Sequence, residues 1–137
     1  MHGDPKQVVL EFYESWARGV IDFEALVDAD IVNYQPDVEP ARGRGLFIAA
    51  VNGVMAAVPD SRWGVVDLLA DGDRVTVRVT WSGTYLGGRF RGFEISAPRP
   101  FSVEHIHIYR VADGKLAEHW VVRDDLAMLV QLGAFGV

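Results

Sequence analysis

The second half of the chain alternates between apolar and polar residues with a period of two. In the segment 75–85, one parity carries Val75, Val77, Val79, Trp81 and Tyr85, and the other carries threonine, serine and arginine. Successive side chains of a strand point to opposite faces, so this alternation predicts a strand with one buried face, Trp81 and Tyr85 included. Similar segments, joined by Gly/Asp turns, continue to residue 123 and predict four or five antiparallel strands, among them one over residues 88–95.

The first half has the spacing of helices. A first amphipathic helix is predicted by apolar residues at i, i+3, i+4 and i+7, namely Val9, Phe12, Tyr13 and Trp16. Asp4 would cap it and Gly19 would end it. A short helix beginning at Asp22, a strand ending before Pro36 and a helix over residues 43–59 follow. This third helix is apolar around most of its circumference, which predicts burial on several sides.

Helices followed by a run of antiparallel strands predict an α+β fold. We expect one domain over residues 1–137, with the N-terminal helices covering a curved mixed or antiparallel sheet and a short helix closing the chain. A curved sheet capped by helices encloses a cone-shaped cavity, which is a common place for a small-molecule site.

Charge and composition exclude several classes of function. The net charge is −6 and the 13 Lys and Arg residues are scattered, so we expect no nucleic-acid surface and no binding to anionic membrane. Cysteine is absent, which excludes disulfides and thiolate sites. Without a signal-like N-terminus or an apolar stretch of membrane-spanning length, the chain is expected to be soluble and cytoplasmic.

Two strands near the C-terminus carry the titratable candidates. In the segment 102–110, His105 and His107 share a face with Val103 and Tyr109, and this face could line a polar pocket or lie at a solvated or intersubunit surface. The opposite face carries Ile106 and Ile108, which favours burial beneath another subunit.

Two adjacent carboxylates, Asp124 and Asp125, stand where the last strand pattern becomes a helix pattern. Asp124 is a good N-cap, and Asp125 in the first turn would favour the helix dipole. In an unbroken strand, however, Asp124 shares a face with Glu118 and Trp120, and a carboxylate in a partly dry site has a raised pKa suited to a general base. The pattern leaves capping and catalysis open.

Histidines also allow a metal site. The pair His105 and His107, with His119, could supply three imidazoles. No further ligand cluster accompanies them, and His119 has the opposite strand parity from Asp124, so we expect no metal.

Two long stretches resemble the SnoaL-like polyketide cyclases. These are "VPDSRWGVVDLLADGDRVTVRVTWSGTYLG" and "YRVADGKLAEHWVVRDDLAMLVQLG", which together run from Val58 to Gly133. They are similar to the family's "FPD", "GD-V--R----GTH-G", "R-ADGKI-EHW" and "D-LG-L-QQLG" motifs in order and spacing. Departures are "GFEISAP" (92–98) in place of the family's "GIPPTG" loop, Tyr85 in place of the histidine of "GTH", and Val130-Gln131 in place of the glutamine pair.

The resemblance implies a nuclear-transport-factor-like cone, usually a homodimer or homotetramer formed through the sheet, and a cofactor-free ring closure on a small hydrophobic polycyclic or polyketide-like substrate. It places the acid/base at Asp124, four residues after the tryptophan of "EHW". By strand parity we add His105, His107 and Tyr85 as catalytic donors. The predicted substrate contacts are Trp16, Tyr34, Trp81, Trp120 and Glu118. An epoxide-opening cyclase or hydrolase and a non-catalytic binding module remain as alternatives on the same fold.

Overall fold

The computed structural model describes residues 4–36, 38–96 and 98–136. Helix α1 (Pro5–Arg18) begins at Asp4, whose side chain accepts from the backbone N–H of Lys6, and ends at Gly19 in a left-handed conformation. The short helix α2 (Phe23–Leu26) is capped by Asp22. Both helix starts and the glycine stop were predicted from the sequence, because capping residues and an αL glycine are local signals.

The main sheet has six strands in the order β2-β1-β8-β7-β4-β3. Its members are β1 (Val27–Tyr34), β2 (Ala41–Arg42), β3 (Arg62–Asp71), β4 (Arg74–Tyr85), β7 (Arg99–Ala112) and β8 (Lys115–Arg123). Neighbouring strands are antiparallel except β1 and β8, which are parallel. The sheet is therefore mixed, because the first long strand of the chain, β1, lies parallel to the last one, β8.

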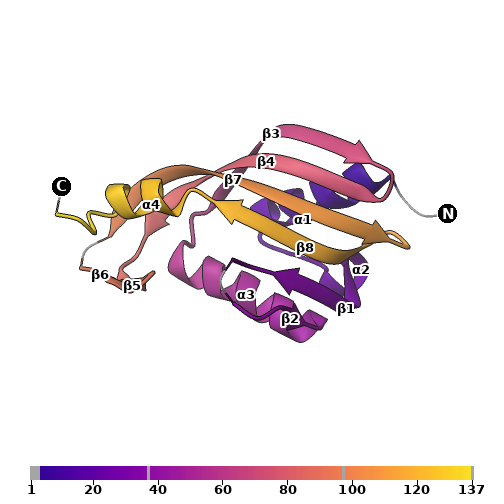
Figure 1. Cartoon of the computed structure of the whole chain (residues 1–137), viewed down its shortest axis with the longest axis horizontal. Helices are drawn as coiled ribbons and strands as arrows, with labels where there is room; N and C mark the ends of the chain where they lie inside the picture. The colour runs from indigo at the N-terminus through magenta and orange to yellow at the C-terminus, as the bar shows by residue number, and fades with distance from the viewer. Residues whose placement is uncertain (1–3, 37, 97, 137) are drawn as a thin grey trace.

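Helices α1, α3 and α4 lie at different places around the sheet. Figure 1 shows α1 behind the sheet, α3 (Arg44–Ala57) along the β1 edge, and α4 (Asp125–Gln131) beside the short strands at one end. Among the described residues no helix is long and apolar enough to cross a membrane. The apolar circumference of α3 does not lead to burial on several sides, because only Phe47 and Val51 are buried. Ala50, Val54 and Ala57 on the same helix line a cavity, and Leu46 is exposed.

The segment 88–95 forms a hairpin instead of the single strand predicted. Strands β5 (Gly88–Phe90) and β6 (Phe93–Ile95) pair through Phe90 and Phe93 around a two-residue turn. Arg91 and Gly92 both have positive φ, 48° and 85°, as the type I′ turn requires. The apolar residues change parity across this turn, from Phe90 to Phe93 and Ile95, and the single-strand prediction overlooked this break in the period-two pattern.

The loop before β3 fixes the end of β4. The Asp60 carboxylate accepts from the Thr84 backbone N–H at 2.8 Å and from its hydroxyl at 2.9 Å, and these bonds hold the pKa of Asp60 below its usual value. A Cβ added to Gly83 would lie 2.6 Å from Cγ1 of Val58, so only glycine allows this close approach. The "PD" and "GTY" segments are thus parts of one packing unit.

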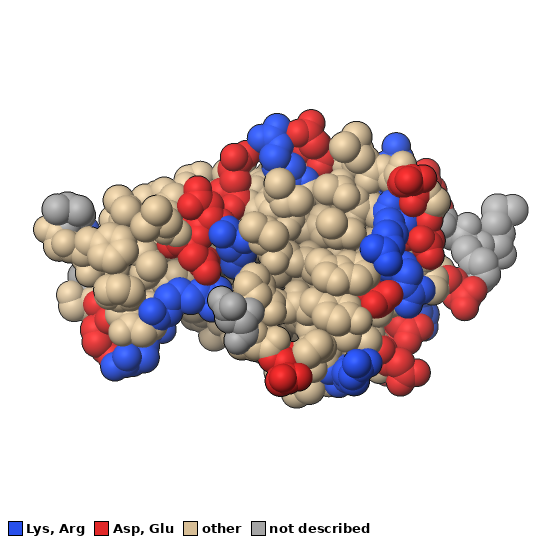
Figure 2. Space-filling view, in the orientation of Figure 1, with Lys and Arg blue, Asp and Glu red and all other residues tan. Residues whose placement is uncertain are grey.

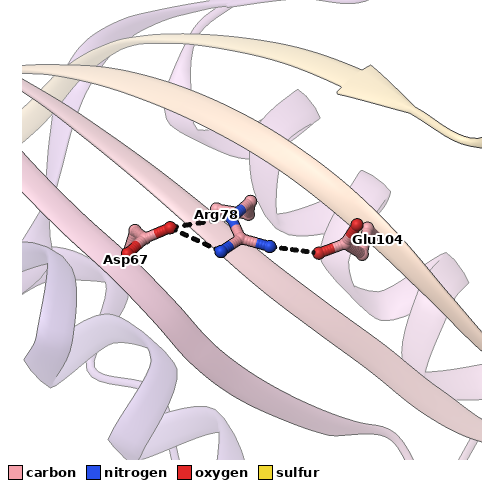
Figure 3. Close-up of polar contacts among 3 residues, drawn as sticks. All are labelled: Asp67, Arg78 and Glu104. Atoms are coloured by element: carbon pink, nitrogen blue, oxygen red, sulfur yellow. Dashed lines mark hydrogen bonds and ion pairs between the residues drawn. The ribbon is translucent and has the colours of Figure 1, made fainter.

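The outer face of the sheet, away from α1, carries charge on some strands and apolar side chains on others. Arg78 on β4 bridges Asp67 on β3 and Glu104 on β7, with N–O distances of 2.6 Å to each (Figure 3). Toward β8 the same face exposes Ile106 and Val122. Figure 2 shows a central area without charged residues, bordered by acidic and basic side chains.

Candidate functional site

A cavity of about 400 Å³ lies between the inner face of the sheet, α1 and α3. Aromatic side chains form much of its wall: Phe12, Tyr13, Trp16, Phe47, Trp63, Trp81, Tyr85, Phe90 and Tyr109. Trp63 and Trp81 are stacked, with ring centroids 5.3 Å apart, because they are paired across β3 and β4. Such walls suit a flat apolar ligand, and the volume is in the usual range for small-molecule sites.

Strand register places the polar side chains of the cavity in adjacent positions. His105 and His107 point inward from β7, and His119 and Arg123 point inward from β8. Across the ladder His105 faces Arg123, and His119 faces Asn33 of β1 on its other side. The β-sheet thereby gathers residues that are up to 90 positions apart, from Asn33 to Arg123, into one wall.

Three histidines and one asparagine form a chain of hydrogen bonds. The Oδ1 atom of Asn33 lies 2.7 Å from Nδ1 of His119, and Nε2 of His119 lies 2.7 Å from Nδ1 of His107. Nε2 of His107 lies 3.3 Å from Nδ1 of His105. An amide oxygen only accepts, so each imidazole carries its proton on Nδ1 and accepts through Nε2. This polarity leaves Nε2 of His105 as the acceptor at the end of the chain.

Burial keeps these histidines neutral. Desolvation, with a smaller contribution from Arg123, lowers the pKa of His105 to about 3 and that of His119 to about 3. The pKa of His107 is also lowered, first by desolvation and then by its histidine neighbours. Neutral rings are the form that the chain needs, because a protonated imidazole has no acceptor nitrogen.

A pair of buried tyrosines lies next to the hydrogen-bonded histidines. The hydroxyls of Tyr13 and Tyr109 lie 2.6 Å apart, and the ring of Tyr109 stacks on His107 with centroids 6.0 Å apart. Desolvation raises the pKa of both tyrosines. They are therefore neutral hydrogen-bonding groups at pH 7.

The charged residues of the cavity wall lie near the start of α4. Arg91, from the β5–β6 turn, pairs with Asp125 through Nε and Oδ2 at 2.9 Å. Arg123 donates to Oε1 of Gln35 at 3.1 Å, and burial lowers the pKa of its guanidinium. Two arginines and one aspartate make this part of the wall positive.

The predicted acid/base residue, Asp124, caps α4. Its Oδ1 atom accepts from the backbone N–H of Ala127 at 3.0 Å, and the residue is exposed and absent from the cavity wall. The capping interpretation of the sequence therefore describes where this carboxylate lies. Its neighbour Asp125 reaches the cavity instead.

Three predicted substrate contacts lie on the outer face of the sheet. Tyr34 and Trp120 stack there with centroids 5.1 Å apart, and Glu118 accepts from Tyr34 and from Arg110. Glu118 and Trp120 point away from the cavity because β8 is not regular, and Tyr34 lies beside them because it pairs with Trp120 across β1 and β8. The register of β8 with β7 shifts after Leu116, so Leu116 and Ala117 are both buried and the inward parity changes to His119, Val121 and Arg123.

The other predicted residues line the cavity. Trp16, Trp81, His105, His107 and Tyr85 all belong to its wall. The Tyr85 hydroxyl donates to the carbonyl of Arg89 at 3.2 Å, and burial raises its pKa. Tyr85 therefore also connects β4 with the hairpin.

The arrangement of the imidazoles suits proton transfer better than metal binding. Their nitrogens bond to one another in series, and the described residues contain no group of three or more His, Cys, Asp or Glu side chains that could hold a metal ion. In this wall, His105 can accept or donate a proton, and the positive charge of Arg123 can stabilise an anionic group of a ligand.

Sequence reasoning missed Asn33, Arg123 and Asp125. Arg123 has the same strand parity as Val121 and His119, which are both buried. The apolar Val121 beside His119 was therefore a sequence signal for the inward face of β8. Asn33 had no local signal, since its role depends on the parallel pairing of β1 with β8.

Comparisons with known proteins agree on one family. A family model described as SnoaL-like polyketide cyclase matches residues 6–132. No curated protein matches the sequence.

Several solved structures are similar over nearly the whole chain. AclR of Streptomyces galilaeus, described as a putative hydroxylase, is 29% identical over 94% of this chain and 95% of its own, with a TM-score of 0.77. IdmH of Streptomyces antibioticus, described as a putative polyketide cyclase, is 29% identical over 96% and 99%, with a TM-score of 0.78. TsrD of Streptomyces laurentii is 31% identical over 94% of both chains, with a TM-score of 0.78.

Proposed function

The chain belongs to the SnoaL-like polyketide cyclase family, and from this premise we propose that it is an enzyme that closes a ring on a small polyketide-like substrate by acid–base chemistry in its cavity. Its fold is the nuclear-transport-factor-like cone of that family. The observation that carries the proposal is the hydrogen-bond chain from Asn33 through His119 and His107 to His105.

In the proposed reaction, Nε2 of His105 removes a proton from a carbon next to a carbonyl group. The resulting enolate attacks a second carbonyl, one carbon–carbon bond forms, and the new alkoxide takes a proton to become a hydroxyl. No electron is gained or lost, so the chemistry requires no redox cofactor. The net positive charge of the cavity wall would favour the oxyanion at each stage.

The low pKa of His105 is compatible with this role. In the cavity without substrate, burial opposes the imidazolium. Proton transfer creates an enolate beside it, and a nearby opposite charge favours the charged form of a base. The series of histidine hydrogen bonds also favours protonation of His105, because a protonated imidazole donates a stronger hydrogen bond to the next ring.

Deuterium exchange tests the proposal without the natural substrate. 2-Tetralone is a bicyclic ketone whose α-protons exchange slowly in neutral D₂O, and NMR follows their loss. We expect the wild-type protein to accelerate exchange and His105→Gln to lose most of it, by roughly 10²- to 10⁴-fold. Glu118→Gln, on the outer face, is the matched control and should retain the rate.

Asp124→Asn in the same assay separates the two candidate bases. Asparagine can still cap α4, so the fold is preserved. If Asp124→Asn loses the exchange and His105→Gln retains it, the base is the aspartate of the family motif and the histidine proposal falls.

A binding module is the second candidate, favoured by the position of Asp124 in the helix cap. In that case the aromatic cavity would hold a ligand without changing it. Tight binding of 2-tetralone with no acceleration of exchange would be the expected result.

We also propose that the protein is a homodimer or homotetramer formed through the outer face of the sheet. Support comes from its exposed apolar side chains, including Ile106 and Val122, which are 45% and 69% exposed in the single chain. A contiguous exposed apolar area of this kind is typical of an association surface.

A further inference from the structure

Arg123 is a partly buried cation that forms no ion pair with any residue that the structure describes. Its guanidinium has five N–H donors, and one hydrogen bond, to Oε1 of Gln35, is found within the described part of the chain. No carboxylate of residues 4–36, 38–96 and 98–136 lies within ion-pair distance of it. A charge removed from water without a partner is costly, so this arginine is poorly explained as a stabilising residue.

Its neighbours leave the cavity wall with excess positive charge. The carboxylate of Asp125 is already paired with Arg91. The described charged residues of the wall are these three, and their sum is +1, while the whole chain carries −6. The cavity is therefore a positive site in an acidic protein, which is the arrangement that attracts and holds an anion.

We propose that the substrate carries a carboxylate, or an equally stable oxyanion, and that Arg123 binds it. The planar guanidinium fork matches a carboxylate in two parallel hydrogen bonds. The remaining wall is aromatic, so the ligand class is a flat or polycyclic carboxylic acid. This inference deepens the proposed function because it names a substrate class for the same cavity.

The position of Arg123 also locates the reacting carbon. Arg123 and His105 face each other across β7 and β8, so an anionic group on the arginine brings the adjacent part of the ligand to Nε2 of His105. The carbon that loses its proton would thus be close in the molecule to the acidic group. Binding the anion also reduces the positive field at the histidine.

A matched pair of probes tests the inference by binding alone. Anthracene-2-carboxylate and anthracene-2-carboxamide have nearly the same shape and differ in charge. Their affinities are measured by fluorescence titration at neutral pH and low salt. We expect the wild-type protein to bind the carboxylate roughly tenfold to a hundredfold more tightly than the carboxamide.

Three variants identify the residue responsible. Arg123→Gln should remove the preference for the carboxylate, and Arg123→Lys should keep part of it because the charge remains. Arg42→Gln makes the same change in net charge at an exposed residue outside the cavity wall, so it should keep the full preference. Thermal melting of each variant establishes that the fold is intact.

Equal binding of the two probes by the wild-type protein, or an unchanged preference in Arg123→Gln, would overturn the inference. The test is separate from that of the proposed function, because 2-tetralone is neutral and the anthracene probes do not react. A preference for the carboxylate without deuterium exchange would leave the anion site standing and remove the enzyme proposal. Deuterium exchange without a preference for the carboxylate would support the enzyme proposal and remove the anion site.

Discussion

Acidification from pH 7 to pH 5 should strongly destabilise the folded state of this protein. His105, His107 and His119 are buried and neutral in the folded chain. In the unfolded chain each titrates near its ordinary pKa of about 6.5. Below that pH the unfolded state binds protons that the folded state does not, so stability falls as the pH falls.

The size of the effect follows from the pKa values. A histidine with a pKa of 6.5 unfolded and about 3 folded loses about 2 kcal/mol of stability between pH 7 and pH 5. His105 and His119 together account for about 4 kcal/mol. Burial lowers the pKa of His107 as well, so its contribution has the same sign. A loss of about 4 kcal/mol is a large part of the stability of a small domain, about 5 to 15 kcal/mol.

Urea unfolding followed by tryptophan fluorescence at several pH values between 7 and 5 measures this loss. The window isolates the histidines, because carboxylates with lowered pKa values, such as Asp60 and Glu118, lose their contribution only at lower pH. The variant His107→Gln interrupts the series of histidine hydrogen bonds, so it should be less stable than the wild-type protein at pH 7. Its free energy of unfolding should nevertheless depend less steeply on pH than that of the wild-type protein, because one of the groups that take up protons on unfolding has been removed.

Two results would refute the reasoning. A free energy of unfolding that is the same at pH 7 and pH 5 would mean that the histidines titrate alike in the folded and unfolded states. An unchanged pH slope in His107→Gln would mean that this residue is not one of the groups that take up protons. Glu118→Gln is the control, and its slope in this window should match that of the wild-type protein.

Two further predictions concern the helix cap and the outer face. Asp124→Ala should lower the free energy of unfolding by about 1 kcal/mol and Asp124→Asn by less, since asparagine still accepts from the Ala127 N–H; equal losses in urea titrations would contradict capping. Val122→Glu should convert the proposed oligomer to a monomer in light scattering at little cost in folding, because the side chain is 69% exposed in the single chain. An oligomer that persists in this variant would place the interface elsewhere.

Local signals were sufficient for much of the fold. The starts of α1, α2 and α4 were predicted from Asp4, Asp22 and Asp124, since an N-cap acts on the backbone within three residues. The inward face of β4 was predicted because a long strand without irregularity keeps one parity. The β5–β6 hairpin was missed because Arg91, a non-glycine residue, takes the first left-handed position of the turn.

The site was harder to predict because it depends on pairing between distant strands. One irregularity at Leu116 and Ala117 reverses the inward parity of β8, and with it the positions of Trp120 and Arg123. The chain of histidines needs Asn33, which reaches His119 only through a parallel strand contact. Strand parity alone therefore found the β7 half of the wall and misplaced the β8 half.

Arg123 and the histidine chain depend on each other. The three imidazoles can bond in series only while they are neutral, and the charge of Arg123 adds to burial in lowering the pKa of all three. An anion on Arg123 cancels part of that field, so the basicity of His105 rises when a ligand of the proposed class is bound. The cavity would then keep its histidines unprotonated while empty and make them better bases when occupied. A neutral ligand such as 2-tetralone leaves the field of Arg123 in place, so His105 should still remove its proton, but more slowly than from an acidic substrate.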